Sequence, residues 1–262
     1  MPVEPAEGEH PMLELRNLSV GADNEGVHRD ILKNVNLRVD DGRLLVLTGP
    51  NGGGKSTLAK TIAGILRPDT GRILLDGEDI TERGITERAR MGIGFAFQQP
   101  VRFKGLTVRD VLTLAAGGQV SEDKLYDYLR DVGLCARDYV DREIGSSLSG
   151  GEIKRIEIAT VIARGARLTI FDEPEAGIDL WSFGNLIEVF KTLKRTLAGS
   201  VVVISHQERI LEIADEIAVL ADGEIVSRGP GKDILPGLLA DGAGCRFCPH
   251  PEDGEIRRQC SL

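Results

Sequence analysis

Hydrophobic and polar positions follow two patterns along the chain, and each pattern predicts a different kind of strand. Near the start they alternate, as in strands that bury only one face, over residues 13–20 and again over 31–39. Further along come short, mainly apolar runs of the kind found in central strands buried on both faces; these are residues 43–48, 168–171 and 201–204. Central strands of this kind indicate a sheet that is covered by helices.

Helical spacing of apolar residues lies between the strands and dominates the middle of the chain. It predicts one helix over residues 57–66, after a glycine-rich loop, and another over 181–197. Residues 107–147 show helical spacing and no convincing strand, so we interpret about 106–164 as a helical subdomain inserted into an α/β core. Further strands are expected at 72–76 and 91–98, with a terminal hairpin at 217–220 and 224–227.

Composition and charge fit a globular protein of 262 residues. Hydrophobic residues make up 41% and charged residues 28%, and 32 basic against 41 acidic side chains give a net charge of −9, which argues against an extended nucleic-acid surface. No apolar run reaches the roughly 18–20 residues of a membrane helix, and the acidic start lacks the features of a signal peptide. We therefore expect a cytoplasmic protein, peripheral to a membrane only through a partner, and no nucleic acid partner. The expected division is a disordered lead-in at 1–11, one α/β domain at 12–235 and a tail at 236–262.

A complete phosphate-binding loop separates the strand at 43–48 from the helix that follows it. Gly49 and Gly54 flank four residues, and Lys55 and Ser56 follow Gly54 directly. In such a loop the backbone N–H groups and a helix N-terminus bind phosphate oxygens, the lysine neutralises the β- and γ-phosphates, and the serine hydroxyl ligates Mg²⁺. The alternative is a glycine-rich turn with a chance lysine. The residues expected to contact a nucleotide are Gly49, Pro50, Asn51, Gly52, Gly53, Gly54, Lys55, Ser56 and Thr57.

Two adjacent acids, Asp172 and Glu173, follow the buried run 168–171, where their mutual repulsion needs a compensating cation. A nucleotide with Mg²⁺ supplies one. Asp172 is expected to hold Mg²⁺ beside Ser56, and Glu173 to act as general base on an attacking water. The alternative is a solvated turn or a helix cap. Glu175, two residues further on, has no assigned role.

Polar residues also end the other two central runs. Thr48 ends the first, and Ser205 and His206 follow the last. Because ligands of open parallel sheets bind at the carboxyl ends of the strands, we expect these groups to converge with Asp172 and Glu173. His206 is then expected to donate a hydrogen bond to the γ-phosphate; the alternative is an ordinary surface or core histidine.

The order of these motifs resembles that of an ABC-type ATPase over about residues 12–235. The motifs are the phosphate loop, Leu148-Ser-Gly-Gly-Glu152 before a helix expected at 153–164, the Phe171-Asp-Glu-Pro174 strand end, and His206. The resemblance implies the α/β fold of phosphate-loop NTPases, with antiparallel strands near the N-terminus and an inserted helical subdomain. It also implies hydrolysis of ATP with Mg²⁺ by a head-to-tail homodimer that forms on ATP.

The resemblance assigns further residues to the site. Gln98 is implied to be the Q-loop glutamine, which senses Mg²⁺ and couples to a partner, and Asp179 to lie in the D-loop. The catalytic candidates are Lys55, Glu173 and His206, and the Mg²⁺ ligands are Ser56, Gln98 and Asp172. The signature residues, which contact the γ-phosphate bound by the other subunit, are Ser149, Gly150, Gly151 and Glu152. For these four, the alternative is a simple loop and helix cap.

Several segments bear on the branch of the family. Transporter ATPases commonly have an aromatic residue near the end of the first strand and a proline after the D-loop aspartate, whereas this chain has none in 19–23 and has Leu180. Residues 96–101 and 206–211 are similar to the ATPase subunit of the SUF iron–sulfur assembly system, although Leu148 stands where that subunit usually has phenylalanine. We favour a SUF-like function with a soluble scaffold subunit as partner.

Two alternatives to that function are retained. Residues 214–226 read much like an importer ATPase, which supports the ATP-binding subunit of a membrane ABC transporter, with a transmembrane permease subunit as partner. A non-hydrolysing, ATP-dependent regulatory or binding module is the alternative from another class. Its usual mark is the loss of Lys55, Glu173 or His206, and all three are present.

The tail contains a cluster of residues with metal-ligand chemistry. Cys245, Cys248, His250 and Cys260 include a Cys-x2-Cys pair and have donor types that suit zinc or an iron–sulfur cluster. Their spacing is irregular at the C-terminal end. We favour free thiols on a flexible tail and keep a zinc or iron–sulfur site as the alternative.

Overall fold

Two sheets form the frame of the protein. The computed structural model describes residues 11–24, 27–99, 103–145, 148–178, 180–196 and 199–240. Within these residues, one sheet is antiparallel and has the order β2-β1-β4-β5, with strands β1 Leu13–Asn24, β2 Val27–Val39, β4 Thr70–Leu75 and β5 Glu78–Asp79. The other has the order β10-β9-β3-β8-β7-β6, with strands β3 Leu44–Thr48, β6 Ile93–Ala96, β7 Leu168–Asp172, β8 Ser200–Ile204, β9 Glu216–Ala221 and β10 Glu224–Pro230. Its pairs are parallel except for the β9–β10 hairpin.

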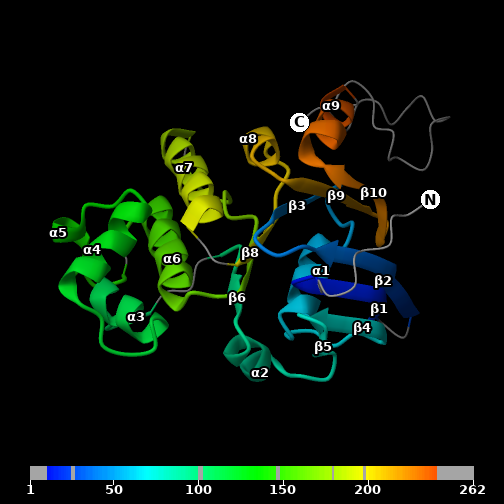
Figure 1. Ribbon diagram of the computed structural model, residues 1–262, viewed down its shortest axis with the longest axis horizontal. Helices are drawn as coiled ribbons and strands as arrows, with labels where there is room; N and C mark the ends of the chain where they lie inside the picture. Colours follow the sequence, from blue (N-terminus) through cyan, green and yellow to red (C-terminus); the bar gives the residue numbers. More distant parts are fainter. Residues whose placement is uncertain are drawn as a thin grey trace.

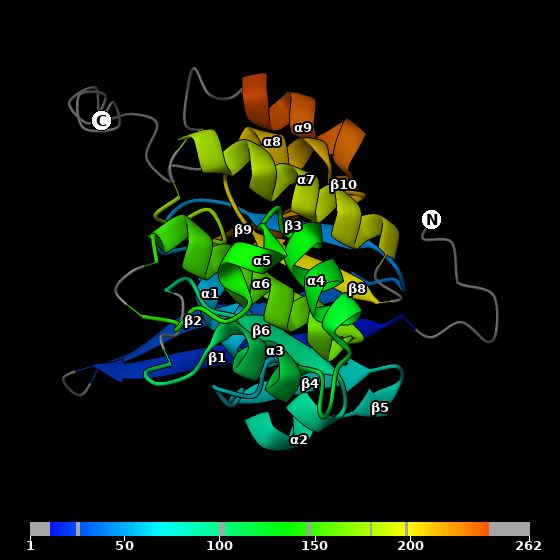
Figure 2. The ribbon, with the colours of Figure 1, turned by 90° about the vertical axis from the view of Figure 1, so that its left-hand side faces the viewer.

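Helices cover the central sheet and form a separate lobe. They are α1 Lys55–Ile62, α2 Ile85–Arg90, α3 Val108–Ala115, α4 Glu122–Asp131, α5 Ala136–Tyr139, α6 Gly150–Arg164, α7 Leu180–Thr196, α8 Glu208–Glu212 and α9 Gly231–Ala240. Figure 1 shows α3 to α6 gathered at one end of the molecule, as the inserted helical subdomain, with the antiparallel sheet at the other end. Figure 2 shows α7, α8 and α9 on one side of the central sheet and β1, β2 and β4 on the other.

The central strand β3 shows why the sheet has two covered faces. Leu44 and Val46 belong to a hydrophobic cluster that continues into the helical subdomain, α7 and α8. Leu45 and Leu47 belong to a second cluster, which joins α1 to the antiparallel sheet. All four side chains are at most 2% exposed. A strand buried on both faces needs apolar residues at every position, which is why this run is continuous rather than alternating.

The predicted fold is confirmed, and the structure adds elements that the sequence pattern did not predict. Short elements with weak patterns were not expected from the sequence; they are β5, α2, α5, α8 and α9. Helix α9 crosses the domain boundary predicted at residue 235: it continues to Ala240, and Leu238 packs against the same core cluster as Leu235. The spacing of apolar residues did not predict this helix, because Pro236 lies inside it and its 10 residues give only a short helical pattern. The expected lead-in, apart from Pro11, and the cysteine-containing part of the tail lie outside the described residues.

A buried arginine on α2 joins the end of α1 to the segment that precedes α2. Arg88 on α2 is 1% exposed. Its guanidinium donates to the backbone oxygens of Thr61 and Ile62 at the C-terminal end of α1 (2.7 and 2.8 Å), and to those of Thr81 and Arg83 (both 2.8 Å). A cation at a helix C-terminus is favoured by the helix dipole. These hydrogen bonds supply a donor to the Ile62 carbonyl and a second donor to that of Thr61, which also accepts from the Gly64 N–H at 3.2 Å.

Replacing Arg88 with alanine is expected to lower the free energy of unfolding by about 3 kcal/mol, because buried carbonyl groups lose their donors. Urea unfolding followed by circular dichroism measures the change. The matched control is Arg90→Ala, an exposed arginine on the same helix, which should change stability by less than about 0.5 kcal/mol. Equal effects of the two substitutions would contradict the role assigned to Arg88.

Candidate nucleotide site

Three parallel strands end side by side at one edge of the central sheet. Strands β3, β8 and β7 are neighbours in that order. Their ends carry Thr48, Ser205 and Asp172, all of which are buried. The loop after each strand therefore begins at the same place, as expected for the ligand-binding edge of an open parallel sheet. Hydrogen bonds between these loops tie them into one site.

The phosphate loop adopts a backbone that only glycine allows at its two ends. Gly49 has φ +136° and Gly54 has φ +99°. A Cβ on Gly49 would lie 2.0 Å from the backbone oxygen of Leu220, and one on Gly54 would lie 2.8 Å from Leu32 Cδ2. The loop is thus pressed against its neighbours and leads directly into α1, so its N–H groups and the helix N-terminus share one concavity.

Lys55 lies inside this loop. It is 6% exposed, and its Nζ donates to the backbone oxygens of Gly49 and Pro50, both at 2.8 Å. Burial lowers the pKa of Lys55, while the nearby carboxylates of Glu173 and Asp172 act in the opposite direction. An ammonium held at the mouth of the loop in this way is placed to neutralise phosphate oxygens.

Asp172 and Ser56 make direct contact across the loop. The Ser56 hydroxyl donates to Asp172 Oδ1 at 3.0 Å, and Asp172 is 3% exposed. Burial raises the pKa of Asp172; the Ser56 hydrogen bond lowers it and the adjacent Glu173 raises it again. A hydroxyl and a buried carboxylate fit Mg²⁺, which takes one or two carboxylates and completes its shell with phosphate oxygens and water. The described part of the chain contains no group of three or more His, Cys, Asp or Glu side chains in metal-binding proximity.

Glu173 has a strained backbone and contacts the predicted Q-loop glutamine. Its φ is +46°, in the left-handed region that costs a non-glycine residue about 1–2 kcal/mol. Its N–H donates to the backbone oxygen of Ile204 (3.0 Å), which fixes the turn against β8. Gln98 Nε2 donates to Glu173 Oε2 at 2.5 Å. The structure therefore brings together the two residues that the sequence placed in base and sensor roles.

Three further predictions concern His206, the signature residues and Asp179. His206 follows β8 at the same edge and its side chain is exposed. Ser149 is the N-cap of α6, where its N–H donates to Glu152 Oε2 (2.7 Å) and its Oγ accepts from the Glu152 N–H (3.3 Å). This capping box leaves Ser149 and Gly150 exposed at a helix N-terminus, which suits an anion. Asp179 lies outside the described residues.

A buried ion pair on α6 was missed by the sequence analysis. Lys154 is 1% exposed, lies 2.9 Å from Glu157 Oε2, and donates to the backbone oxygen of Phe97 at 2.5 Å. Glu157 Oε1 in turn accepts from the Phe97 N–H at 3.2 Å. The two side chains thus hold both backbone groups of the residue before Gln98. The available signal was the pair of opposite charges three positions apart in a helix that is otherwise largely buried.

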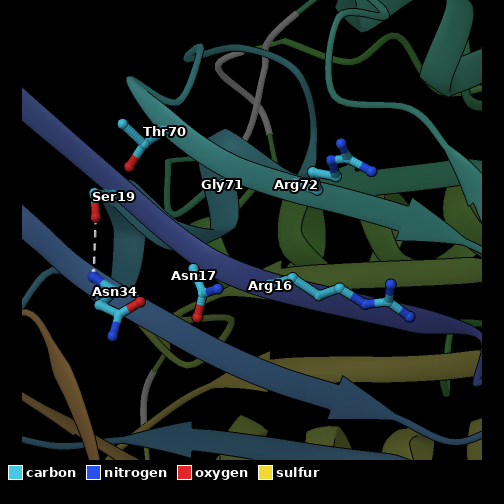
Figure 3. A pocket seen from close by; sticks show the side chains of 7 residues that line it. All are labelled: Arg16, Asn17, Ser19, Asn34, Thr70, Gly71 and Arg72. Carbon is cyan, nitrogen blue, oxygen red and sulfur yellow. Dashed lines mark hydrogen bonds between the residues drawn. The ribbon is translucent and has the colours of Figure 1, made fainter.

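A shallow recess on the antiparallel sheet is separate from the nucleotide loop. Figure 3 shows its lining, which includes Arg16, Ser19, Asn34 and Arg72. Arg16 already pairs with Glu14 at 2.7 Å, and the Ser19 hydroxyl accepts from the Asn34 N–H at 3.0 Å. The recess has no residue in common with the strand-end site, and we assign no role to it.

Fold and site together define a phosphate-loop ATPase with an inserted helical subdomain. Comparison with known proteins narrows the class. The family described as "ABC transporter" matches residues 32–176, which is more than half of the chain. The chain therefore belongs to this family and is an ABC-type ATPase.

Individual relatives agree with this assignment. The chain is 42% identical over 215 residues to an uncharacterized ABC transporter ATP-binding protein of Methanocaldococcus jannaschii, covering 79% of this chain and 86% of the relative. It is 31% identical to a probable branched-chain amino acid transport ATP-binding protein of Archaeoglobus fulgidus, covering 78% and 85%. Among solved structures, CbiO1 of Clostridium perfringens, part of an ABC transporter complex, superimposes with a TM-score of 0.75 at 27% identity and covers 90% of this chain and 94% of that one.

The comparisons bear on the choice of branch as well. The names of these three relatives refer to transport, and none of the three refers to iron–sulfur assembly. They therefore support the transporter alternative better than the SUF-like function favoured from the sequence. In the described part of the chain, no helix is both long and apolar enough to cross a bilayer.

Substituting Lys154 with methionine is expected to destabilise the protein by about 3 kcal/mol, because Glu157 is left as an unpaired, largely buried carboxylate. The double variant Lys154→Met/Glu157→Met should be more stable than the single variant, because both charges are then gone. Urea unfolding measures both.

Lys191→Met serves as the control for this pair, since Lys191 forms an exposed ion pair with Glu188 on α7 and should contribute less than about 1 kcal/mol. If the double variant proves less stable than Lys154→Met, the ion pair is not what the single substitution disrupts.

Proposed function

We propose that this chain is the Mg²⁺-dependent ATP-hydrolysing subunit of a complex in which hydrolysis moves a bound partner subunit. One observation supports it most directly: Lys55, Ser56, Asp172 and Glu173, from two loops far apart in sequence, meet at one edge of the sheet. A non-hydrolysing binding module needs the phosphate loop but has no use for the carboxylate at 173, which is held on a strained backbone.

The roles follow from the chemistry of each group. The loop N–H groups and Lys55 bind the phosphates of ATP. Ser56 and Asp172, with Gln98, would hold Mg²⁺, which when bound neutralises charge on the β- and γ-phosphates. Glu173 orients the attacking water and accepts its proton, and the exposed His206 donates a hydrogen bond to a γ-phosphate oxygen.

The proposed active form is a head-to-tail homodimer that assembles on ATP. In a single chain, Ser149 and Gly150 open onto solvent at the N-terminus of α6. That helix N-terminus offers N–H groups and partial positive charge to an anion. A second copy facing the phosphate loop would place these groups against its γ-phosphate, so each of the two ATP sites needs residues from both subunits.

The partner surface is proposed to lie beside the Q-loop and the helical subdomain. Phe97, Phe103 and Leu114 are exposed there, at 37%, 42% and 69%. Phe97 is also held at its backbone by α6, so a partner resting on it would act on Gln98 next to it. Exposed apolar side chains of this kind are suited to contact with a docking segment of another subunit.

Two partners of different kinds are compatible with this surface. The names of the relatives favour a transmembrane permease, which would make the chain the ATP-binding subunit of an ABC transporter located at the cytoplasmic face of a membrane. A soluble scaffold subunit of a SUF-like system is the second candidate. The observations in its favour are Leu180 after the D-loop aspartate and the absence of an aromatic residue in 19–23.

Purification of the tagged full-length chain from its native host, with and without detergent extraction of membranes, separates the two partners. For a transporter we expect an integral membrane protein to co-purify only from detergent extracts. A SUF-like role instead requires soluble partner subunits in the detergent-free fraction. Exchange of Phe97 for serine should weaken capture of either partner. Val226→Ser, at an exposed position of β10 on the opposite edge of the central sheet from β6, should not.

Replacing Glu173 with glutamine is expected to lower the kcat for ATP hydrolysis by at least about a hundredfold while ATP still binds, because an amide cannot accept the proton of the water. The same variant should accumulate as a dimer in MgATP, which size-exclusion chromatography with light scattering detects. Glu224→Gln, at an exposed position of β10, is the matched control and should retain the parent kcat. Unchanged turnover in Glu173→Gln would exclude Glu173 as the base.

A further inference from the structure

Glu175 is a buried acid that has no part in the function proposed above. It is 9% exposed, and its Oε1 accepts a 2.5 Å hydrogen bond from the Ser205 hydroxyl. Its second oxygen, Oε2, is shielded from solvent and has no hydrogen-bond partner among the described residues. A buried carboxylate oxygen without a donor costs stability, so its retention in the site calls for a donor that reaches it in another state of the protein.

Ser205 connects this acid to the backbone on both sides of His206. The residue is fully buried at the end of β8, and its N–H donates to the backbone oxygen of Leu47 at 3.2 Å. Its hydroxyl oxygen accepts from the Gln207 N–H at 3.0 Å while its proton goes to Glu175. The hydroxyl therefore fixes the chain on either side of the histidine and links it to the loop that carries Glu173.

His206 is among the groups that influence the pKa of Glu175. Burial is the largest influence and raises the pKa of Glu175. The Ser205 hydrogen bond, a hydrogen bond from its own backbone and the nearby His206 lower it, and Glu173 raises it. His206 is thus close enough to favour the ionised acid. The two ring nitrogens of a histidine differ, and a carboxylate on one of them orients the other toward its target.

We propose that Glu175 is a positioning residue for His206: its free Oε2 accepts the Nδ1–H of the imidazolium form of His206 when the ring turns toward the nucleotide, so that Nε2–H donates to the γ-phosphate. The acid thereby ties the loop of the general base to the loop of the histidine. This inference rests on the role proposed above for His206. No covalent step is involved.

The test compares Glu175→Gln, His206→Ala and the double variant in the full-length protein with MgATP. In Glu175→Gln the amide oxygen can still accept from Ser205, but the NH₂ group cannot accept from an imidazole N–H. We expect kcat to fall about tenfold with the KM for ATP within about twofold, because orientation is lost and binding is not. The kcat of His206→Ala should fall by at least as much. The kcat of the double variant should be no lower than that of His206→Ala alone, because the acid acts only through the ring.

A matched control and a stability measurement separate positioning from packing. Glu212→Gln, at an exposed position of α8, should keep the parent kcat. Urea unfolding of each variant shows whether the fold has been weakened. If Glu175→Gln fails to fold, Ser205→Ala replaces it in the same cycle, because it removes the hydrogen bond that fixes the chain around His206.

Three outcomes overturn the inference, and they are distinguishable from one another. If His206→Ala leaves kcat unchanged, the proposed role of His206 fails and the role of Glu175 fails with it. If His206→Ala lowers kcat but Glu175→Gln does not, only the positioning role is excluded. If the losses in the double variant multiply, Glu175 acts independently of the ring, as a residue that merely packs the loop would.

Discussion

The parallel pairing of β3, β8 and β7 is the constraint on which the site depends. Backbone hydrogen bonds set Leu47 beside Ile204 and Phe171 beside Val203, so the three strands end in register. Because each strand is buried on both faces, a slip by one residue would exchange its side chains between the two clusters and draw a polar strand end into the buried sheet. The energy that fixes the register is hydrophobic, yet its result is that three polar loops open at one place.

The sequence predicted this arrangement because its signals are local. Unbroken apolar runs followed at once by polar residues define buried strands and their ends, and the glycines at 49 and 54 occupy positions where the structure allows no Cβ. The contacts that were not predicted join distant segments. Ser205 and Glu175 are 30 residues apart, and Lys154 reads as a surface lysine until Phe97, 57 residues away, is seen beside it. Helix α9 is short and contains Pro236, so its sequence has no pattern strong enough to mark where the helix ends.

The branch of the family was harder to predict than the fold for a related reason. Residues that bind ATP act on a ligand of fixed chemistry, so their types and spacing are constrained. A docking surface, by contrast, has only to match its own partner. Exposed side chains such as Phe97 and Leu114 therefore show no periodicity or spacing that identifies that partner. Local likenesses around the Q-loop therefore pointed to SUF-like proteins, whereas comparison over most of the chain gave relatives named as transporter subunits.

The separate contacts of the site form one connected path. Glu173 accepts from Gln98, and Phe97, the residue before it, is bound through both backbone groups by Lys154 and Glu157 of α6. The helix that carries these two side chains begins at Ser149, which is proposed to face the γ-phosphate of a second subunit. A displacement of residue 97 would therefore move the amide that holds Glu173, the proposed general base, and would also strain the buried ion pair on α6. Packed elements of this kind move as units rather than deform, so we propose that the partner surface, Glu173 and the trans contact are coupled through this path.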